Sequence, residues 1–274
     1  MAIPIQTKEQ LELFEYQQFE DKFKPKKTTD DCYTPENIYN AVLDWCCSRY
    51  GIDPETVVRP FWPGADFTRT EYPEGCTVID NPPFSIMSKI ITWYMQNGIR
   101  FFLFGNGLTA IQHVGKGCTA ICTGNNITYA KGASIQTGFL TNLEPPEIVA
   151  MSCPELYQIL DKINTVNQKV GKKQITKITM PNAVITAAKL NLFSIHNTEF
   201  TVKRSEALEI DKLDNYSKGI FGKGLLLSER AAAERAAAKR AAAERAAAER
   251  IELSDREKAL QKMIGKKTKG DTRQ

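Results

Sequence analysis

An amide, two prolines and an aromatic ring follow a short apolar run in the sequence TVIDNPPFS, residues 77–85. Pro82 and Pro83 restrict the backbone, and because proline has no N–H, the nearby carbonyl groups are free from pairing in a sheet. An exocyclic base amine is planar because its lone pair is conjugated with the ring. If the side-chain oxygen of Asn81 and the carbonyl of Pro82 each accept one amine hydrogen, the nitrogen moves toward tetrahedral geometry. It can then attack an electrophilic methyl group.

The aromatic residue of this segment suits the same chemistry. The ring of Phe84 can stack on a base that has been flipped out of its duplex, and such a stack contributes about 1–3 kcal/mol. No strong base is needed, since the proton is lost after the nitrogen becomes cationic. The pattern therefore predicts Asn81, Pro82 and Phe84 as catalytic residues, and the alternative is a turn that merely ends a core strand.

Elements on both sides must position this segment. The buried run 77–80 predicts a strand, which puts Asn81 at the carboxyl edge of a sheet, where open α/β sheets bind ligands. Upstream, Thr34 is a suitable N-cap and Pro35 a suitable first residue for a helix that Gly51 ends. A strand at 57–61 and the loop WPGADF lie between the helix and the motif.

The rest of the pattern predicts an α/β fold with a mixed sheet and an antiparallel hairpin at one edge. The expected helices cover residues 7–19, 86–96 and 156–166. The expected strands cover residues 101–104, 119–123, 127–129, 133–140, 175–180 and 199–203.

The run Asp80-Asn81-Pro82-Pro83-Phe84 resembles the catalytic motif of S-adenosylmethionine-dependent amino methyltransferases. Together with the Thr-Pro helix start, it is similar to DNA N6-adenine methyltransferases of the EcoRI type, in particular to small phage-borne relatives. The resemblance spans about residues 20–225 and implies a Rossmann-like sheet, S-adenosylmethionine as cofactor and adenine in DNA as substrate. It places these residues near the cofactor: Tyr33, Thr34, Pro35, Phe61, Gly64, Asp66 and Asp80.

One half of the family pattern is shortened. The loop after the first strand has one glycine where the family has two, and only residues 67–76 separate that loop from the motif strand. A crossover between parallel strands takes about a dozen residues or more. We therefore expect the loop to join two neighbouring strands directly, in a truncated sheet that lacks the acidic residue holding the cofactor ribose. Asp66 or Glu71 could substitute, and cofactor binding would be weak or absent.

Charge is divided unevenly along the 274 residues. Of the 36 basic and 32 acidic residues, 13 and 8 lie from Ser228 onward, so the body holds 23 basic and 24 acidic residues. Nucleic-acid binding would therefore depend on local patches. The segment KFKPKK supplies one patch, predicted to contact phosphates through Lys22, Lys24, Lys26 and Lys27.

The alternatives to a DNA methyltransferase are an enzyme for an RNA base amine or a protein glutamine, and a catalytically silent nucleic-acid-binding protein.

Residues 229–250 form a pentad repeat of the type ERAAA. Alanine and long charged residues favour helix, but steps of five residues advance about 140° per repeat and give no continuous apolar stripe. The sequence thus predicts a solvated helix over 228–264 that could dock on a partner. The other expected units are an N-terminal helix and basic linker (1–30), a methyltransferase-like domain (31–227) and a basic tail (265–274).

The seven cysteines form no CxxC pair, which favours reduced, buried thiols over zinc binding. The two histidines, His113 and His196, are predicted to be surface or core-boundary residues rather than catalysts. No apolar run is long enough to span a membrane, and the first residues do not resemble a secretion signal. A cytoplasmic protein is therefore expected.

Overall fold

The structure is a computed structural model that describes residues 34–62, 65–129, 134–164, 181–214 and 218–248. Several predicted features lie outside the described residues. They are the helix at 7–19, the lysines Lys22, Lys24, Lys26 and Lys27, the cofactor-side residues Tyr33 and Gly64, the strand at 175–180, and the chain beyond 248.

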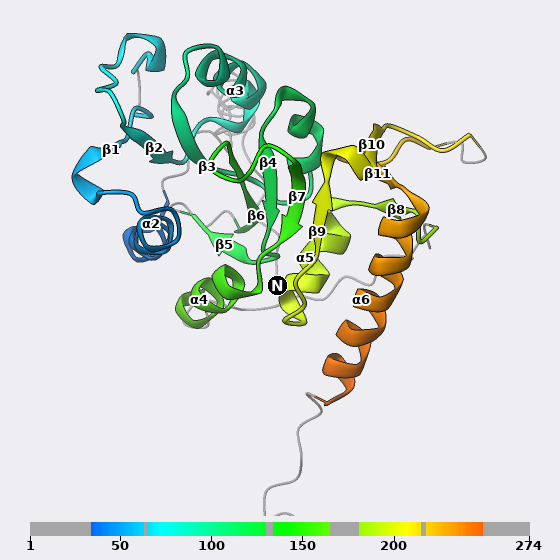
Figure 1. The fold of residues 1–274 in the computed structure, drawn as a ribbon. Helices are drawn as coiled ribbons and strands as arrows, with labels where there is room; N and C mark the ends of the chain where they lie inside the picture. The colour runs from blue at the N-terminus through cyan, green and yellow to red at the C-terminus, as the bar shows by residue number, and fades with distance from the viewer. Residues whose placement is uncertain (1–33, 63–64, 130–133, 165–180, 215–217, 249–274) are drawn as a thin grey trace, which may run out of the picture.

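A mixed sheet forms the centre of the molecule (Figure 1). The three strands at one side are mutually parallel, and β4 is parallel to β7, whereas the other neighbours are antiparallel. In spatial order the strands are β1 (Val57–Val58), β2 (Thr77–Asp80), β3 (Arg100–Asn106), β6 (Ser134–Thr141), β4 (Thr119–Cys122), β7 (Ile148–Ser152) and β9 (Thr201–Lys203), with β5 (Asn126–Thr128) paired to β6.

Helices cover both faces of this sheet because its strands are apolar on both sides. Successive residues of β3 alternate, so that Phe101 and Leu103 join one core while Phe102 and Phe104 join the other. The first core is completed by α3 (Met87–Gln96) and α5 (Ala187–Ile195), and the second by α2 (Glu36–Tyr50) and α4 (Pro154–Asn164). The α/β class predicted from the sequence is confirmed.

The predicted hairpin lies in the middle of the sheet, and the prediction of an edge position is wrong. Strands β5 and β6 pair as expected, but β6 is inserted between β3 and β4. Gly107 permits this arrangement, because a Cβ atom at this position would lie 2.9 Å from the backbone of Thr137. The Gly107 N–H donates to Gln136 O at 2.7 Å, so Gly107 extends the contact of β3 with β6 by one residue beyond the end of β3.

The shortened loop joins two parallel neighbours, as predicted. Strands β1 and β2 pair directly, and the described part of the connection 59–76 holds only the short 3-10 helix η3 (Phe67–Arg69). Strand β1 ends earlier than expected, since Pro60 has no N–H and the N–H of Phe61 donates to Asp80 instead. The sequence prediction missed β7, α5 and a small second sheet of β10 (Ala207–Ile210), β11 (Gly224–Leu227) and β8 (Val184–Ile185).

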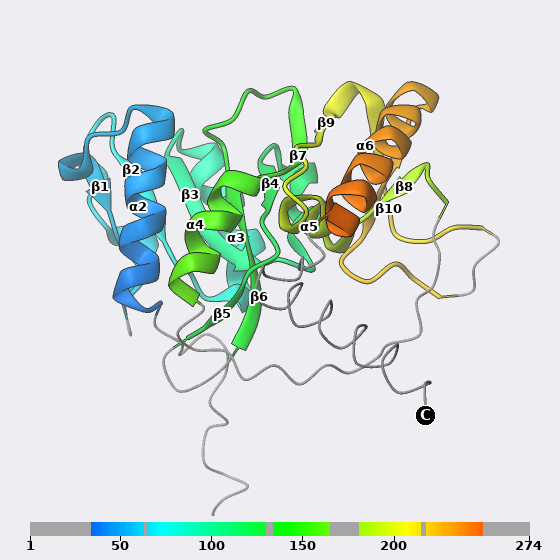
Figure 2. The same ribbon diagram turned by 90° about the horizontal axis from the view of Figure 1, so that it is seen from below.

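The alanine-rich repeat forms α6 (Glu229–Ala248), and the prediction of a solvated helix is wrong for one face of its first four turns. Ala231, Arg235 and Ala242 are buried, with Ala238 packed beside them. These residues are spaced by four, three and four, which places them on one face of a helix. Figures 1 and 2 show α6 lying along the end of the sheet beside α5, which it contacts together with β11. Small alanine side chains allow this close approach.

No helix within the described ranges is both long and apolar enough to cross a membrane. Six of the cysteines belong to these ranges, and all are free thiols. Five of the six are buried, and burial raises the pKa of Cys118 and of Cys122 to about 12. His113 is also buried, and burial lowers its pKa to about 4.

Candidate active site

The NPPF segment lies where the sequence predicts it, directly after the buried strand β2. Asn81 is half-buried and Pro82 is buried. Pro83 is the N-cap of the short 3-10 helix η4 (Phe84–Ile86), which leads into α3. Phe84 begins η4 and is half-buried against the core on the α3 side. The three predicted catalytic residues are therefore held between a buried strand and a core helix.

Asp80 fixes the end of β2 to the loop that follows β1. Its side chain is buried, with the whole residue 4% exposed. One oxygen, Oδ2, accepts from the Phe61 N–H at 3.1 Å, and Oδ1 accepts from the Asn81 N–H at 2.9 Å. The guanidinium of Arg59 lies 3.4 Å from Oδ1. Burial raises the pKa of Asp80, and the two N–H groups and Arg59 oppose the rise.

A second contact ties α2 to the same strand end. The Tyr39 hydroxyl donates to Ile79 O at 3.1 Å, and the Arg59 guanidinium lies over the Tyr39 ring at 3.6 Å from its centroid. Burial raises the pKa of Tyr39 to about 12, so the hydroxyl remains a donor at neutral pH. Neither Tyr39 nor Arg59 was predicted as a site residue. The signal for Arg59 is its place two residues before Phe61, at the carboxyl end of β1.

The helix that starts with Thr-Pro differs from the prediction at its first residues. Pro35 occupies the N-cap and Glu36 is the first helical residue, so Thr34 is not the cap. The end is as predicted, with Gly51 in the left-handed conformation that glycine favours. The Thr34 hydroxyl is buried and has no hydrogen-bond partner among the described residues. A buried hydroxyl without a partner is costly, which suits a position that contacts a polar ligand.

Aromatic rings support the loop between β1 and β2. Phe61 packs against Phe67 and Tyr94, with ring centroids 5.9 and 6.5 Å away. The Tyr72 hydroxyl donates to Phe67 O at 2.7 Å and lies 3.1 Å from the Tyr94 hydroxyl. This cluster was not predicted as a unit. It keeps the shortened connection folded against α3.

The Asp66 side chain is engaged within the loop that joins β1 and β2. Its Oδ1 accepts from the N–H and the hydroxyl of Thr68, at 3.0 and 2.7 Å, and thereby caps η3. These two hydrogen bonds lower its pKa. Arg69 lies 3.5 Å from the other oxygen. Asp66 is therefore a turn-capping residue on the surface, and the expectation that it replaces the ribose-binding acid has no support in its contacts.

The edge of the sheet at the end of β2 therefore holds two kinds of group, which are hydrogen-bonded polar residues and aromatic rings. The structure brings together Asp80, Asn81 and Phe61 through hydrogen bonds, with Phe84 three residues further along the chain. Trp62, which was not predicted as a site residue, is 62% exposed next to Phe61. Arg59 lies 6.0 Å from the centroid of its ring. These side chains give the edge an exposed aromatic surface beside a rigid amide.

Searches with this chain against models of protein families, against characterised proteins and against solved structures found no match. The geometry at the end of β2 and the sequence motif are therefore the basis for any functional assignment.

Proposed function

We propose that this protein transfers a methyl group from S-adenosylmethionine to the N6 amine of adenine in DNA, in the cytoplasm of a bacterial or phage-infected cell. The observation that carries the proposal is the position of Asn81-Pro82-Pro83-Phe84 at the carboxyl end of β2. Ligands bind at this edge in open α/β sheets. The residue types are those that a planar base amine needs in order to become nucleophilic.

Rigidity at the strand end is what makes the arrangement suitable. Asp80 accepts hydrogen bonds from two backbone N–H groups, one of which belongs to Asn81, so the backbone at Asn81 is held in place. The proline that follows is buried and has no N–H to compete for acceptors. The Asn81 side-chain oxygen and the Pro82 carbonyl each accept one hydrogen of the amine. The nitrogen then loses conjugation with the ring, and after it has formed its new bond its extra proton leaves to water.

Two aromatic residues are suited to hold the base. Phe84 is half-buried and fixed at the start of η4, so its ring offers a prepared surface for stacking. The exposed ring of Trp62 lies in the loop that follows β1, the strand next to β2. We propose that Trp62 and Arg59 contact the DNA around the flipped adenine, since arginine pairs with phosphates and tryptophan stacks on bases.

The cofactor supplies the electrophilic methyl group when it is bound. The residues in this chain that would hold it are Thr34, whose buried hydroxyl has no partner in the described part of the chain, and Phe61, whose ring is half-buried beside β1. Asp80 would act indirectly, because both of its oxygens already accept hydrogen bonds. Its role is to position Phe61 and Asn81.

A second candidate is a catalytically silent protein that binds nucleic acid. One observation favours it: β1 is the edge of the sheet, and Asp66 is committed to Thr68. Asp66 is thus not free to bind a cofactor ribose, and no further strand lies beyond β1 among the described residues. This candidate retains the aromatic and basic surface at Trp62 and Arg59 but needs no bound cofactor.

The deciding experiment is to express the chain in a methylation-deficient bacterial host and digest the DNA to nucleosides. We expect N6-methyladenine with the unaltered protein and with an Asn97→Ala control, which removes an exposed amide at the end of α3. We expect none with Asn81→Ala. Equal N6-methyladenine with and without Asn81 would contradict the proposal, as would its absence throughout.

The purified protein separates the remaining candidates. Labelled S-adenosylmethionine incubated with DNA, RNA and protein fractions identifies which substrate receives the methyl group. Calorimetry that shows salt-sensitive DNA binding but no cofactor binding would favour the silent protein.

A further inference from the structure

Strand β3 ends beside the candidate active site with a second asparagine, Asn106. β3 is the parallel neighbour of β2, and Asp80 at the end of β2 pairs with Leu103 (Figure 1). Parallel strands end at the same edge of a sheet, so Asn106 lies at the edge that carries Asn81. Continuing both strands at about 3.3 Å per residue, with about 4.8 Å between them, places the Cα atoms of Asn81 and Asn106 roughly 8 Å apart.

The turn that follows β3 holds Asn106 in one place. The Asn106 side-chain oxygen accepts from the Leu108 N–H at 2.9 Å. Gly107 is fixed on both sides, since its N–H donates to Gln136 O at 2.7 Å and its oxygen accepts from the Asn191 side chain at 3.0 Å. The turn is therefore pre-formed, as a binding site of defined geometry requires.

The amide of Asn106 has one group that the turn does not use. Its oxygen is bound to the Leu108 N–H, so the NH₂ group lies on the other side of the amide. This nitrogen makes no hydrogen bond within the described ranges and is accessible to solvent. Thr137, which pairs with Asn106 from β6, is already engaged, because its hydroxyl donates to Ile135 O and lies 2.9 Å from the Tyr129 hydroxyl. Asn106 therefore offers N–H donors to a ligand.

An N–H donor at this place matches adenine. In the proposed reaction, the Asn81 side-chain oxygen and the Pro82 carbonyl accept both hydrogens of the base amine. The amine of adenine stands between two ring nitrogens, N1 and N7, which are hydrogen-bond acceptors. A further contact beside the amine must therefore come from a donor. Across roughly 8 Å, two asparagine side chains and their hydrogen bonds, each about 3 Å long, leave room for one edge of the ring.

We propose that Asn106 binds the flipped adenine by donating from its side-chain NH₂ group to a ring nitrogen next to the amine. The inference rests on the proposed function, which puts the base at the end of β2. A base that is held only by its amine and by stacking on Phe84 can still rotate in its own plane. The contact from Asn106 fixes that rotation and aligns the amine nitrogen for attack.

The variant Asn106→Asp separates the donor from the turn. A carboxylate at this position still accepts from the Leu108 N–H, whereas the NH₂ donor is lost. Asn97→Asp is the matched control, because it adds the same charge at an exposed asparagine that ends α3, away from Asn106. Thermal denaturation checks that both variants remain folded.

Binding of single-stranded oligodeoxyadenylate, measured by fluorescence anisotropy, tests the contact without methyl transfer. Three labelled strands are compared, which contain adenine, 7-deazaadenine or 1-deazaadenine, so that two of them lack one ring nitrogen. With the unaltered protein and with Asn97→Asp, we expect one deaza strand to bind about three- to ten-fold more weakly than the adenine strand, as the loss of one hydrogen bond predicts. With Asn106→Asp, we expect this preference to be lost.

Comparison between strands removes effects that act on all of them, such as the added charge. The same preference in the unaltered protein and in Asn106→Asp would overturn the proposal, as would equal binding of the three strands or no binding of any. Failure of the proposed function gives a different result. A preference that depends on Asn106, without any N6-methyladenine in the host DNA, would reject methyl transfer and retain the base contact. N6-methyladenine without such a preference would reject the base contact alone.

Discussion

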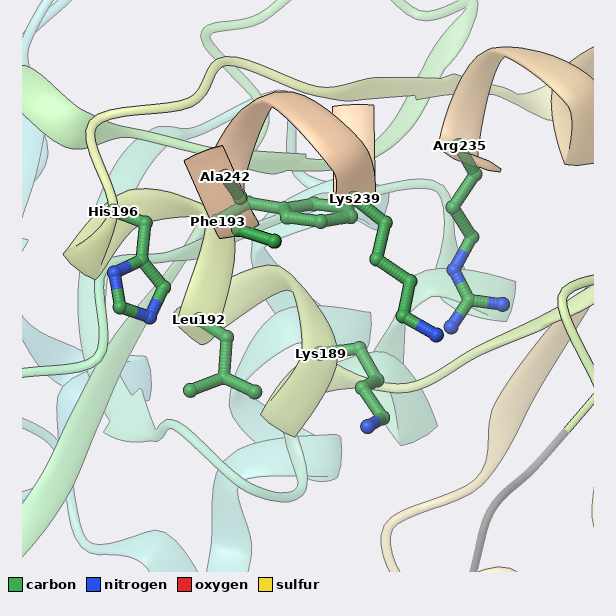
Figure 3. Close-up of a pocket in the computed structure, with 8 residues that line it drawn as sticks. Lys189, Leu192, Phe193, His196, Arg235, Lys239 and Ala242 are labelled. Carbon is green, nitrogen blue, oxygen red and sulfur yellow. The ribbon is translucent and has the colours of Figure 1, made fainter. Parts of the chain in front are cut away.

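Two buried charges mark opposite sides of this molecule, and the protein treats them differently. Asp80, at the end of β2, accepts hydrogen bonds from two backbone N–H groups and has Arg59 beside it. Arg235, on α6, donates to three carbonyl groups but has no carboxylate partner in the described part of the chain. The first charge has a cation and two N–H donors beside it within the protein. The second retains its positive charge beside a small pocket between α5 and α6, which Figure 3 shows.

This difference indicates what each region is built to do. A carboxylate whose oxygens are already occupied cannot serve as a ligand, so Asp80 gives rigidity to the amide and prolines that follow it. An arginine whose hydrogen-bond partners are all neutral carbonyl groups keeps its net positive charge, because no carboxylate neutralises it. The region around Asn81 is thus characterised by rigid positioning. The region around α6 is characterised by a charge that has no carboxylate partner among the described residues.

The largest effect is expected from Arg235→Ala. The substitution leaves three carbonyl oxygens without their donor and opens a cavity under α6, so we expect the free energy of unfolding to fall by about 3–5 kcal/mol. Urea denaturation measures the change. Arg240→Ala is the matched control, because Arg240 occupies the same place in the repeat but is exposed. A loss below about 1 kcal/mol for Arg235→Ala would mean that the guanidinium gains as little from the carbonyls as it would from water.

A smaller effect is expected from Asp80→Asn. The amide keeps the shape of the side chain, but its NH₂ group faces one of the two backbone N–H donors, so we expect a loss of about 1–3 kcal/mol. Asp66→Asn is the control, because Asp66 also accepts a hydrogen bond from a backbone N–H but is exposed. If Asp80→Asn and Asp66→Asn lower the free energy of unfolding equally, the burial of Asp80 does not add to the cost of the substitution.

The pH dependence of the same variant sharpens the comparison. Burial raises the pKa of Asp80 in the folded protein above its ordinary value of 3.8, so the folded state holds this proton more tightly than the unfolded state. The resulting stabilisation is present below about pH 4 and is lost as the pH rises through the folded pKa. We therefore expect the stability difference between the unaltered protein and Asp80→Asn to be larger at pH 4 than at pH 7. A difference that grows with pH would show that the N–H groups and Arg59 outweigh burial.

The Asn81 side could be predicted largely from sequence because its determinants are local. An apolar run followed by Asn-Pro-Pro-Phe fixes a strand, its end and the next turn within ten residues, and β2 and α3 appear where expected. Tyr39 and Arg59 were missed because their contacts with Ile79 and Asp80 join separate elements. The central position of β6 was missed for the same reason: pairing between distant strands is decided by packing, which a local pattern does not encode.

The α6 side could not be predicted because its repeat is too regular. Arg230, Arg235 and Arg240 occupy equivalent places in identical or similar pentads, and sequence alone treats them alike. Five-residue steps rotate each arginine by about 140°, so only one of three consecutive arginines faces the protein. Which one it is depends on how α6 docks on α5 and β11, and these elements were themselves missed or weakly predicted.

The smallest effect on stability is expected at Glu234, which is next to Arg235 in the sequence. Glu234 precedes Arg235 but is 52% exposed, and it pairs with Arg230, which also pairs with Glu206. Exposed pairs of this kind contribute little, so we expect Glu234→Ala to lower the free energy of unfolding by less than about 0.5 kcal/mol, and by less still in high salt. The same urea denaturation, at low and high salt, measures this. A salt-resistant loss of about 1 kcal/mol or more would mean that the Glu206–Arg230–Glu234 network, rather than Arg235, fixes the start of α6.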